Sequence, residues 1–226
     1  MHLLTLHLLA PDLPALHRFY AEVLGLPTHA TAAGLRVQLG YSELIFRPAA
    51  LGTAPFYHFA LHVPHNQLDA AYAWFAARTP LLPFTDGQPI AEFPNWQARA
   101  FYFLDPAGNI LECIARQPLP NASPRPFAAA SLLGLSEVGV VTPAVLPTAE
   151  ALTAAHGIPA FHRGPRLPNF AALGDDEGLL ILTETQRGWL PTGRPAEPHW
   201  LRLEGEQAGR PFVLEANEHT GADSRA

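Results

Sequence analysis

Histidine and glutamate side chains set in apolar, strand-like segments are the residues of this sequence best suited to chemistry. His58 lies within residues 57–63, and Glu112 lies in the apolar run of residues 110–114. A neutral imidazole and a carboxylate suit Fe(II), Mn(II), Zn(II) or Ni(II) as ligands. The same two groups could instead form a hydrogen bond across a sheet, which would fix the core without any metal.

The segments that must position these residues follow one order three times: a strand, a helix and then further strands. The first helix is expected to begin at Asp12, a preferred N-cap residue, and to end near Gly25. The second should begin near Asn66, and the third should span residues 148–156 and end at Gly157. The expected strands are residues 3–9, 35–39, 44–47, 57–63, 98–104, 110–115, 138–141, 170–173, 179–183, 199–203 and 211–215.

The three copies can be aligned by Pro11, Pro64 and Pro143, which assigns the side chains of each first strand to two faces. Side chains alternate along a strand, so one face should meet the helices and the other should lie opposite them. The apolar pairs expected to face the helices are Leu6 and Leu8, Phe59 and Leu61, and Val138 and Val140. The opposite face then carries Thr5 and His7, His58 and His62, and Glu137 and Gly139.

Two stretches of the first two copies resemble a known family. Asp12 leading into residues 19–26 (FYAEVLGL) is similar to that family's first helix, and residues 101–112 (FYFLDPAGNILE) are similar to its last hairpin. The family is the vicinal oxygen chelate superfamily, which includes glyoxalase I, extradiol dioxygenases and bleomycin resistance proteins. The resemblance implies an α+β fold of repeated βαβββ modules, whose curled mixed β-sheets pair to form a cup around a metal or small ligand.

The resemblance also implies where a metal would bind, because the family's ligands lie on the first and last strands of its modules. Carried over by position, His58 and Glu112 are expected to be metal ligands. Thr5 occupies the first-module position where active relatives usually place His, Gln or Glu, and is expected to line the substrate pocket. The third ligand would be His7, His62 or Glu137, the last of these if the third module packs against the cup.

The predicted hairpin register places a further group in the cup. If Leu104 pairs with Ile110, Tyr102 lies opposite Glu112 and faces the same way. Its hydroxyl could orient a bound oxygen anion or donate a proton, which makes Tyr102 the candidate catalytic residue. Trp96 has the same parity and is expected to form a wall of an aromatic-lined substrate pocket.

The domain organisation follows from the repeat. Residues 1–50 and 55–117 are expected to pair as two modules, followed by a Pro-rich linker at 118–128. Residues 129–216 would form a third module with additional strands, and residues 217–226 a frayed tail. Modules of this kind work in pairs, so the third would pair with the C-terminal strands or with a second chain. A homodimer is therefore expected.

Composition excludes several classes of function. Of 226 residues, 48% are hydrophobic and the net charge is −6 with no cluster of basic residues, so nucleic acid is not an expected partner. No apolar run is long enough to span a membrane. The single cysteine, Cys113, rules out an intramolecular disulfide framework. Without the pattern of a signal peptide, the protein is expected in the cytoplasm.

Two functions remain open at this level. The first is a metal-dependent enzyme of glyoxalase or dioxygenase type that acts on a small oxygen-rich molecule. The second is a metal-free protein that binds a small molecule in the same cup, as bleomycin-binding relatives do. His58 and Glu112 favour the enzyme, whereas Thr5 and the apolar last strand of the first module favour the binding protein.

Overall fold

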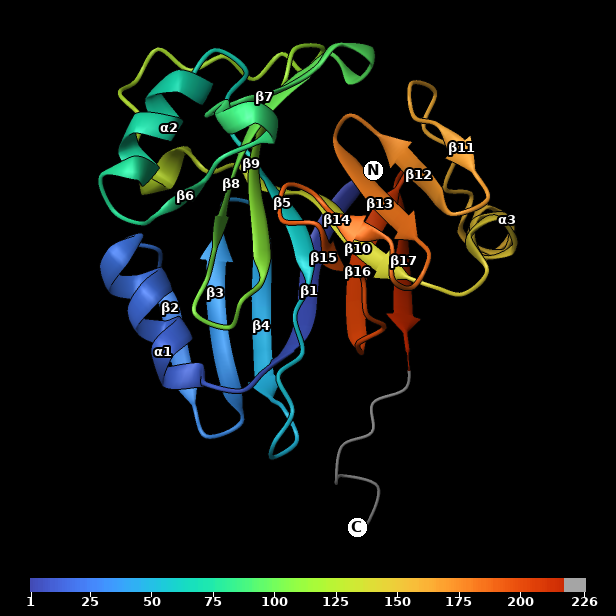
Figure 1. Cartoon of the computed structure of the whole chain (residues 1–226), viewed down its shortest axis with the longest axis horizontal. Helices are drawn as coiled ribbons and strands as arrows, with labels where there is room; N and C mark the ends of the chain where they lie inside the picture. Colours follow the sequence, from blue (N-terminus) through green and yellow to red (C-terminus); the bar gives the residue numbers. More distant parts are fainter. Residues whose placement is uncertain (218–226) are drawn as a thin grey trace.

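The computed structural model describes residues 1–217, in which three modules and the last two strands of the chain share one large curled sheet, and one short hairpin forms a separate two-stranded sheet (Figure 1). The predicted α+β fold of repeated modules is confirmed. Apart from Asn217, the tail expected to fray lies outside the described residues. No helix among the described residues is long and apolar enough to cross a membrane.

Each of the three modules follows the order strand, helix and further strands. The first contains β1 (His2–Ala10), α1 (Leu13–Arg18), the π-helical η1 (Phe19–Val23), β2 (Thr28–Thr31), β3 (Gly34–Leu39) and β4 (Ser42–Pro48). The second contains β5 (His58–His62), α2 (Leu68–Ala76), β6 (Leu81–Leu82), η2 (Thr85–Gly87), β7 (Ala91–Phe93), η3 (Pro94–Trp96), β8 (Ala98–Leu104) and β9 (Ile110–Arg116).

The third module and the C-terminal strands complete the chain. The third contains η4 (Ala129–Ser131), β10 (Gly134–Val141), α3 (Val145–His156), β11 (Arg166–Leu167), β12 (Phe170–Asp175) and β13 (Gly178–Thr183). Four further strands follow: β14 (Gly188–Trp189), β15 (Arg194–Pro195), β16 (Leu201–Gln207) and β17 (Arg210–Ala216). The first and last strands of every module pair in parallel, as β1 with β4, β5 with β9 and β10 with β13.

Helix α3 begins at Val145, three residues before the predicted start at residue 148, and of the two N-caps considered in the sequence one is present and one is not. Asp12 caps α1 as expected, because its side chain accepts a hydrogen bond from the Ala15 backbone N–H at 2.9 Å. Asn66 does not cap α2, which begins after Gln67. The Asn66 side chain instead forms two hydrogen bonds with the backbone of Ser123, in the Pro-rich segment of residues 118–128. A distant partner therefore competes successfully with the local cap.

Module pairing differs from the expectation that residues 1–50 pair with residues 55–117. Within residues 1–217, β5 pairs antiparallel with β10 and β1 pairs antiparallel with β16, and no ladder joins β1 to β5. The second module therefore shares its cup with the third, and the first faces the C-terminal strands. The third module needs no second chain to pair with, which removes the original reason for a homodimer. The homodimer itself stays a prediction.

The core lies between the curled sheet and the helices that cover its outer faces. Helix α1 packs on β3 and β4, α2 packs on β8 and β9, and α3 packs on β12 and β13. All six side chains expected to face the helices are at most 2% exposed and belong to the main core cluster: Leu6, Leu8, Phe59, Leu61, Val138 and Val140. Because strand side chains alternate, this burial turns His58 and Glu137 toward the inside of the cup.

Candidate metal centre

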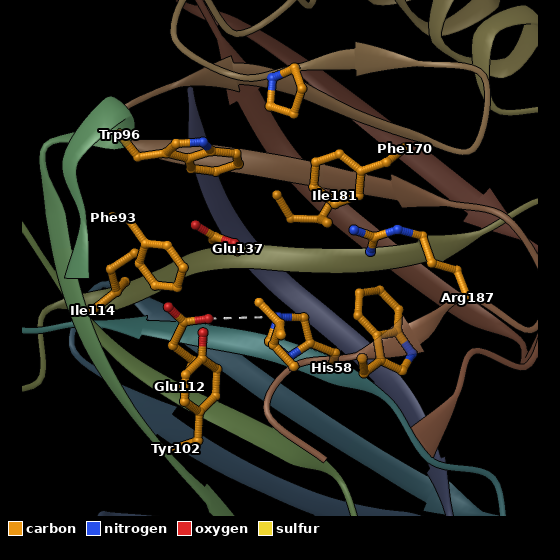
Figure 2. Close-up of a pocket in the computed structure, with 13 residues that line it drawn as sticks. His58, Phe93, Trp96, Tyr102, Glu112, Ile114, Glu137, Phe170, Ile181 and Arg187 are labelled. Carbon is orange, nitrogen blue, oxygen red and sulfur yellow. Dashed lines mark ion pairs between the residues drawn. The ribbon is translucent and has the colours of Figure 1, made fainter. Parts of the chain in front are cut away.

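A cavity of about 220 Å³ lies in the cup that the second and third modules form (Figure 2). Strands β5, β8, β9, β10 and β13 supply its floor, and residues 187–190, around β14, supply one wall. Most of the lining is apolar or aromatic, with a few polar groups among it. The lining residues are His58, Phe93, Trp96, Tyr102, Glu112, Ile114, Glu137, Pro165, Phe170, Ile181, Arg187, Trp189 and Leu190.

Three potential ligand side chains meet in this cavity. His58 comes from β5, Glu112 from β9 and Glu137 from β10, and one ligand atom of each lies within 4.8 Å of the other two. Strand register brings them together: Glu112 is paired with Ala60, and Ala60 also lies opposite Glu137 on the other side of β5. Two carboxylates and one imidazole therefore converge from three adjacent strands.

The imidazole of His58 is held with one nitrogen facing the carboxylates. Its Nδ1 lies 3.1 Å from the carbonyl oxygen of Ile110, so Nδ1 carries the proton and donates this hydrogen bond. Nε2 is 3.7 Å from Oε2 of Glu112, which is too long for a hydrogen bond (dashed line in Figure 2). Burial lowers the pKa of His58 to about 4, so the ring stays neutral near pH 7 and Nε2 keeps a free lone pair.

The two carboxylates have unusual electrostatic surroundings. Burial raises the pKa of Glu112 well above its usual range, the nearby Glu137 raises it further, and Arg116 opposes both effects. Burial also raises the pKa of Glu137, while the ion pair with Arg116 lowers it. Arg116 is fully buried, and its Nε donates to Ser136 Oγ at 3.3 Å. One buried cation therefore stands beside two buried acids.

Tyr102 lies where the predicted hairpin register places it. The ladder pairs Leu104 with Ile110 and Tyr102 with Glu112. Burial raises the pKa of Tyr102 well above its usual range, and the charges of Glu112 and Glu137 add to this effect. The phenol therefore keeps its proton, and Figure 2 shows it beside the Glu112 carboxylate at one side of the cavity.

The third-module position that corresponds to Glu112 is apolar. Glu112 lies two residues after Ile110, the partner of His58, and Ile181 lies two residues after Leu179, the partner of Glu137. Ile181 is therefore the third-module counterpart of Glu112. The three side chains could supply one nitrogen and two carboxylate ligands, with no ligand from the position of Ile181, and such a set suits a divalent ion such as Fe(II), Mn(II), Zn(II) or Ni(II) with open positions.

Gly139 makes room for the cavity wall beside His58. It lies on the inner face of β10, two residues after Glu137, as the alignment of the copies predicted. A Cβ atom at this position would lie 2.7 Å from the ring of Trp189 and 3.1 Å from the carbonyl oxygen of His58. The absent side chain lets Trp189 pack on His58, with ring centroids 4.9 Å apart.

Three residues singled out in the sequence lie away from this cavity. Thr5 and His7 are on β1, which faces β16, and His7 Nε2 is 3.7 Å from Oε1 of Glu204. His62 is on β5 but four residues beyond His58, roughly 13 Å along the strand at ~3.3 Å per residue. Its Nε2 contacts the Glu177 carbonyl oxygen at 3.1 Å. Of the three proposed third ligands, only Glu137 joins His58 and Glu112.

Other residues of the site were missed by sequence reasoning. Arg116 shares the parity of Glu112 and Ile114 along β9, a signal that could have placed it on the same face. Arg187 and Trp189 lie in residues 184–198, where no regular element was expected. The only sequence signal in that segment is Trp189, a large aromatic residue among glycines and prolines. Trp96 lines the cavity as expected, although from the short helix η3 rather than from a strand.

No known protein-family model and no curated protein matches this sequence. The structure is similar to that of a putative dioxygenase from Bacillus subtilis subsp. subtilis str. 168, with a TM-score of 0.59, 14% identity, and coverage of 95% of this chain and 84% of that chain. It is also similar to glyoxalase I from Zea mays, with a TM-score of 0.50, 17% identity, and coverage of 81% of this chain and 66% of that chain. A Zea mays glyoxalase I mutant gives a TM-score of 0.50 at 18% identity, over 86% of this chain and 70% of that chain.

Identities this low bear on the fold and not on the reaction. The module order and the parallel pairing of first and last strands agree with these similarities. This chain therefore has a glyoxalase-type fold.

Proposed function

We propose that this protein is a metal-dependent enzyme of glyoxalase or dioxygenase type, which acts on a small oxygen-rich molecule in the cavity of the second and third modules. The observation that carries this proposal is the convergence of His58, Glu112 and Glu137, with ligand atoms within 4.8 Å of one another. Burial of such groups is costly, and Arg116 forms an ion pair with only one of the two acids, so a further cation would stabilise the cluster.

The three side chains would hold a divalent ion, with the open side toward the cavity. A bound ion would supply Lewis-acid polarisation to adjacent oxygen atoms of the substrate. The hydrogen bond from His58 Nδ1 to the Ile110 carbonyl fixes the orientation of the ring, as partners of metal-binding histidines commonly do.

Tyr102 would act on the substrate from beside the metal. Its raised pKa keeps the hydroxyl protonated, so the hydroxyl can donate a hydrogen bond to an oxygen atom that becomes negative. The apolar walls around it, including Ile114, Phe170 and Ile181, exclude water. Such exclusion strengthens each electrostatic interaction inside the cavity.

A metal-free binding protein is the second candidate, and one contact favours it. Glu137 already has a cationic partner in Arg116, so an apo site carries part of its own charge compensation. The apolar Ile181, at the third-module position that corresponds to Glu112, also favours the metal-free candidate. In that case the cavity would bind its ligand through aromatic contacts and Tyr102 and would catalyse no reaction.

The metal content of purified protein, grown with added Fe, Mn or Zn, separates the two candidates. We expect close to one equivalent of a single metal. His58→Ala, Glu112→Ala and Glu137→Gln should each lower that content sharply, because each removes one of three ligands. His7→Ala and His62→Ala are matched controls, since both histidines lie outside the cavity, and they should leave the metal content unchanged.

Two results would contradict the enzyme proposal. The first is a metal content near zero under every growth condition, which would favour the binding protein. The second is full metal content in the His58 and Glu112 variants together with its loss in a control variant. That pattern would place a metal elsewhere in the chain.

A further inference from the structure

Arg187 is a second polar feature of the cavity, apart from the metal centre. Its guanidinium extends into the cavity from the side opposite Glu112 and Tyr102 (Figure 2). The group lies over the ring of Phe170, with the guanidinium carbon 4.4 Å from the ring centroid. Of the described residues that line the cavity, Arg187 is the only arginine or lysine.

This cation has no anionic partner of its own. Within residues 1–217, the ion pairs of the neighbouring arginines are accounted for: Arg116 with Glu137, Arg163 with Asp176, and Arg166 with Glu150. No ion pair or side-chain hydrogen bond of Arg187 accompanies them. Burial lowers its pKa, since little water and no carboxylate offset the loss of hydration, yet a guanidinium keeps its charge near pH 7. A partly buried, unpaired cation on a cavity wall is suited to an anion that arrives with a ligand.

The backbone around Arg187 is fixed before any ligand binds. Its N–H donates to the Glu184 carbonyl at 3.2 Å, and its carbonyl accepts from the Ala196 N–H at 2.9 Å. The adjacent Gln186 N–H donates to the Ala196 carbonyl at 2.8 Å. Preorganisation of this kind reduces the entropy lost when a ligand is bound.

The space between Arg187 and the three potential ligands has mostly aromatic and apolar walls. Aromatic rings of Phe93, Trp96, Phe170 and Trp189 line it, and its volume of about 220 Å³ is below the range usual for drug-sized ligands. A ligand that fills it must therefore be small. Aromatic walls favour a planar, unsaturated body.

We propose that Arg187 anchors a carboxylate group of the substrate, so that the enzyme acts on small planar carboxylic acids whose oxygen-bearing end faces His58, Glu112 and Glu137. The planar guanidinium can donate two parallel hydrogen bonds to the two oxygen atoms of a carboxylate. The stacking contact with Phe170 keeps that plane in place. This assignment rests on the proposed use of the cavity as the substrate site, but not on the presence of the metal.

Benzoate and benzamide test the assignment, because they share shape and differ in charge. Binding to the chelator-treated full-length protein is followed by calorimetry or by fluorescence of the cavity tryptophans. We expect benzoate to bind about tenfold or more tightly than benzamide, the usual scale for hydrogen bonds to charged groups. Arg187→Gln should abolish this preference and leave benzamide binding unchanged, which also shows that the variant is folded. Arg187→Lys should keep part of it, since an ammonium lacks the planar fork.

Arg210→Gln is the matched control, because Arg210 is exposed on β17, lies outside the cavity and has no ion pair among the described residues. It should retain the full preference for benzoate. Equal binding of the two probes by the wild type, or a preference that survives Arg187→Gln, overturns the assignment.

The Glu112→Gln/Glu137→Gln variant separates this proposal from the metal. If this double variant still prefers benzoate to benzamide, the result supports Arg187 as the carboxylate anchor, whatever the metal content of the wild type. If the preference for benzoate appears only when metal is added, and Arg187→Gln does not change it, the carboxylate binds the metal. That result would refute the role of Arg187.

Discussion

At the scale of single residues, the site is defined by how a few buried charges balance. Glu112 and Glu137 lie close together with raised pKa values, and Arg116 is the buried cation that compensates them in part. Arg116 is fully buried, one of its Nη groups reaches Glu137, and its other Nη has no hydrogen bond in the described chain. We infer that Glu137 is shared between Arg116 and the proposed metal.

This balance of buried charges predicts how removal of Arg116 changes the stability of the fold. Arg116→Met leaves a buried carboxylate unpaired and should lower the free energy of unfolding by about 3–5 kcal/mol. Arg116→Met/Glu137→Gln removes both charges and should recover much of that loss. Urea unfolding of the two variants and of Glu137→Gln gives the coupling energy between the side chains.

The same variant links stability to metal. With Arg116 gone, Glu137 is free for the metal, so added Mn(II) or Zn(II) should stabilise Arg116→Met more than the wild type. A double variant as unstable as the single one, or a metal effect independent of Arg116, would show that the two side chains are not coupled.

At the scale of elements, β5 is the strand around which the site is built, because it pairs with β9 on one side and β10 on the other. Its position relative to β9 is fixed near the site. The Asn109 side-chain oxygen accepts from the Tyr57 N–H at 2.9 Å, and the Ile110 N–H donates to the Tyr57 carbonyl at 2.8 Å. Asp105, bonded to Asn109 and to the Tyr20 hydroxyl, holds that loop against η1.

Burial of His62 on β5 predicts a pH dependence of stability. Burial lowers the pKa of His62 to about 3, and the charge of Arg116 contributes. The unfolded chain takes up a proton on this residue below about pH 6.5, whereas the folded chain does so only near pH 3. The stability that His62 contributes is therefore present above pH 6.5 and is lost as the pH falls from 6.5 toward 3.

His62→Gln tests this element without touching the cavity. Between about pH 6 and pH 5, its free energy of unfolding should fall less steeply than that of the wild type, by roughly 1.4 kcal/mol per pH unit. His29→Gln, at an exposed histidine of β2, is the control and should keep the wild-type slope. An unchanged slope in His62→Gln would mean that His62 is not buried in its neutral form.

At the scale of the whole molecule, local patterns predicted the modules but not their pairing. The register of the hairpin of β8 and β9 could be predicted correctly, because its alternation and the Pro106 and Gly108 of its loop are local signals. Whether β5 pairs with β1 or with β10 depends on contacts between strands that are far apart in the sequence. No local sequence pattern indicates which of these pairings forms. The same limit explains why Glu137 was one option among three, and why Arg187, in an irregular segment, was missed.

The pairing also explains why half of the expected site is absent from the first module. Thr5 lies on β1, which pairs with β16 in another part of the sheet, so its side chain does not line the cavity that contains His58. The third module supplies Glu137 instead. The proposed ligand set therefore comes from the second and third modules, and not from the first two modules in the sequence.

The most direct measurement is an anomalous diffraction map from a crystal of the full chain grown with Mn(II) or Zn(II). The account predicts one strong peak about 2.0–2.3 Å from His58 Nε2 and from one oxygen atom each of Glu112 and Glu137. The peak should disappear in Glu112→Gln. A map without a peak between these three side chains, at metal concentrations that saturate such sites, or a peak bound by other residues, would contradict the proposed metal centre.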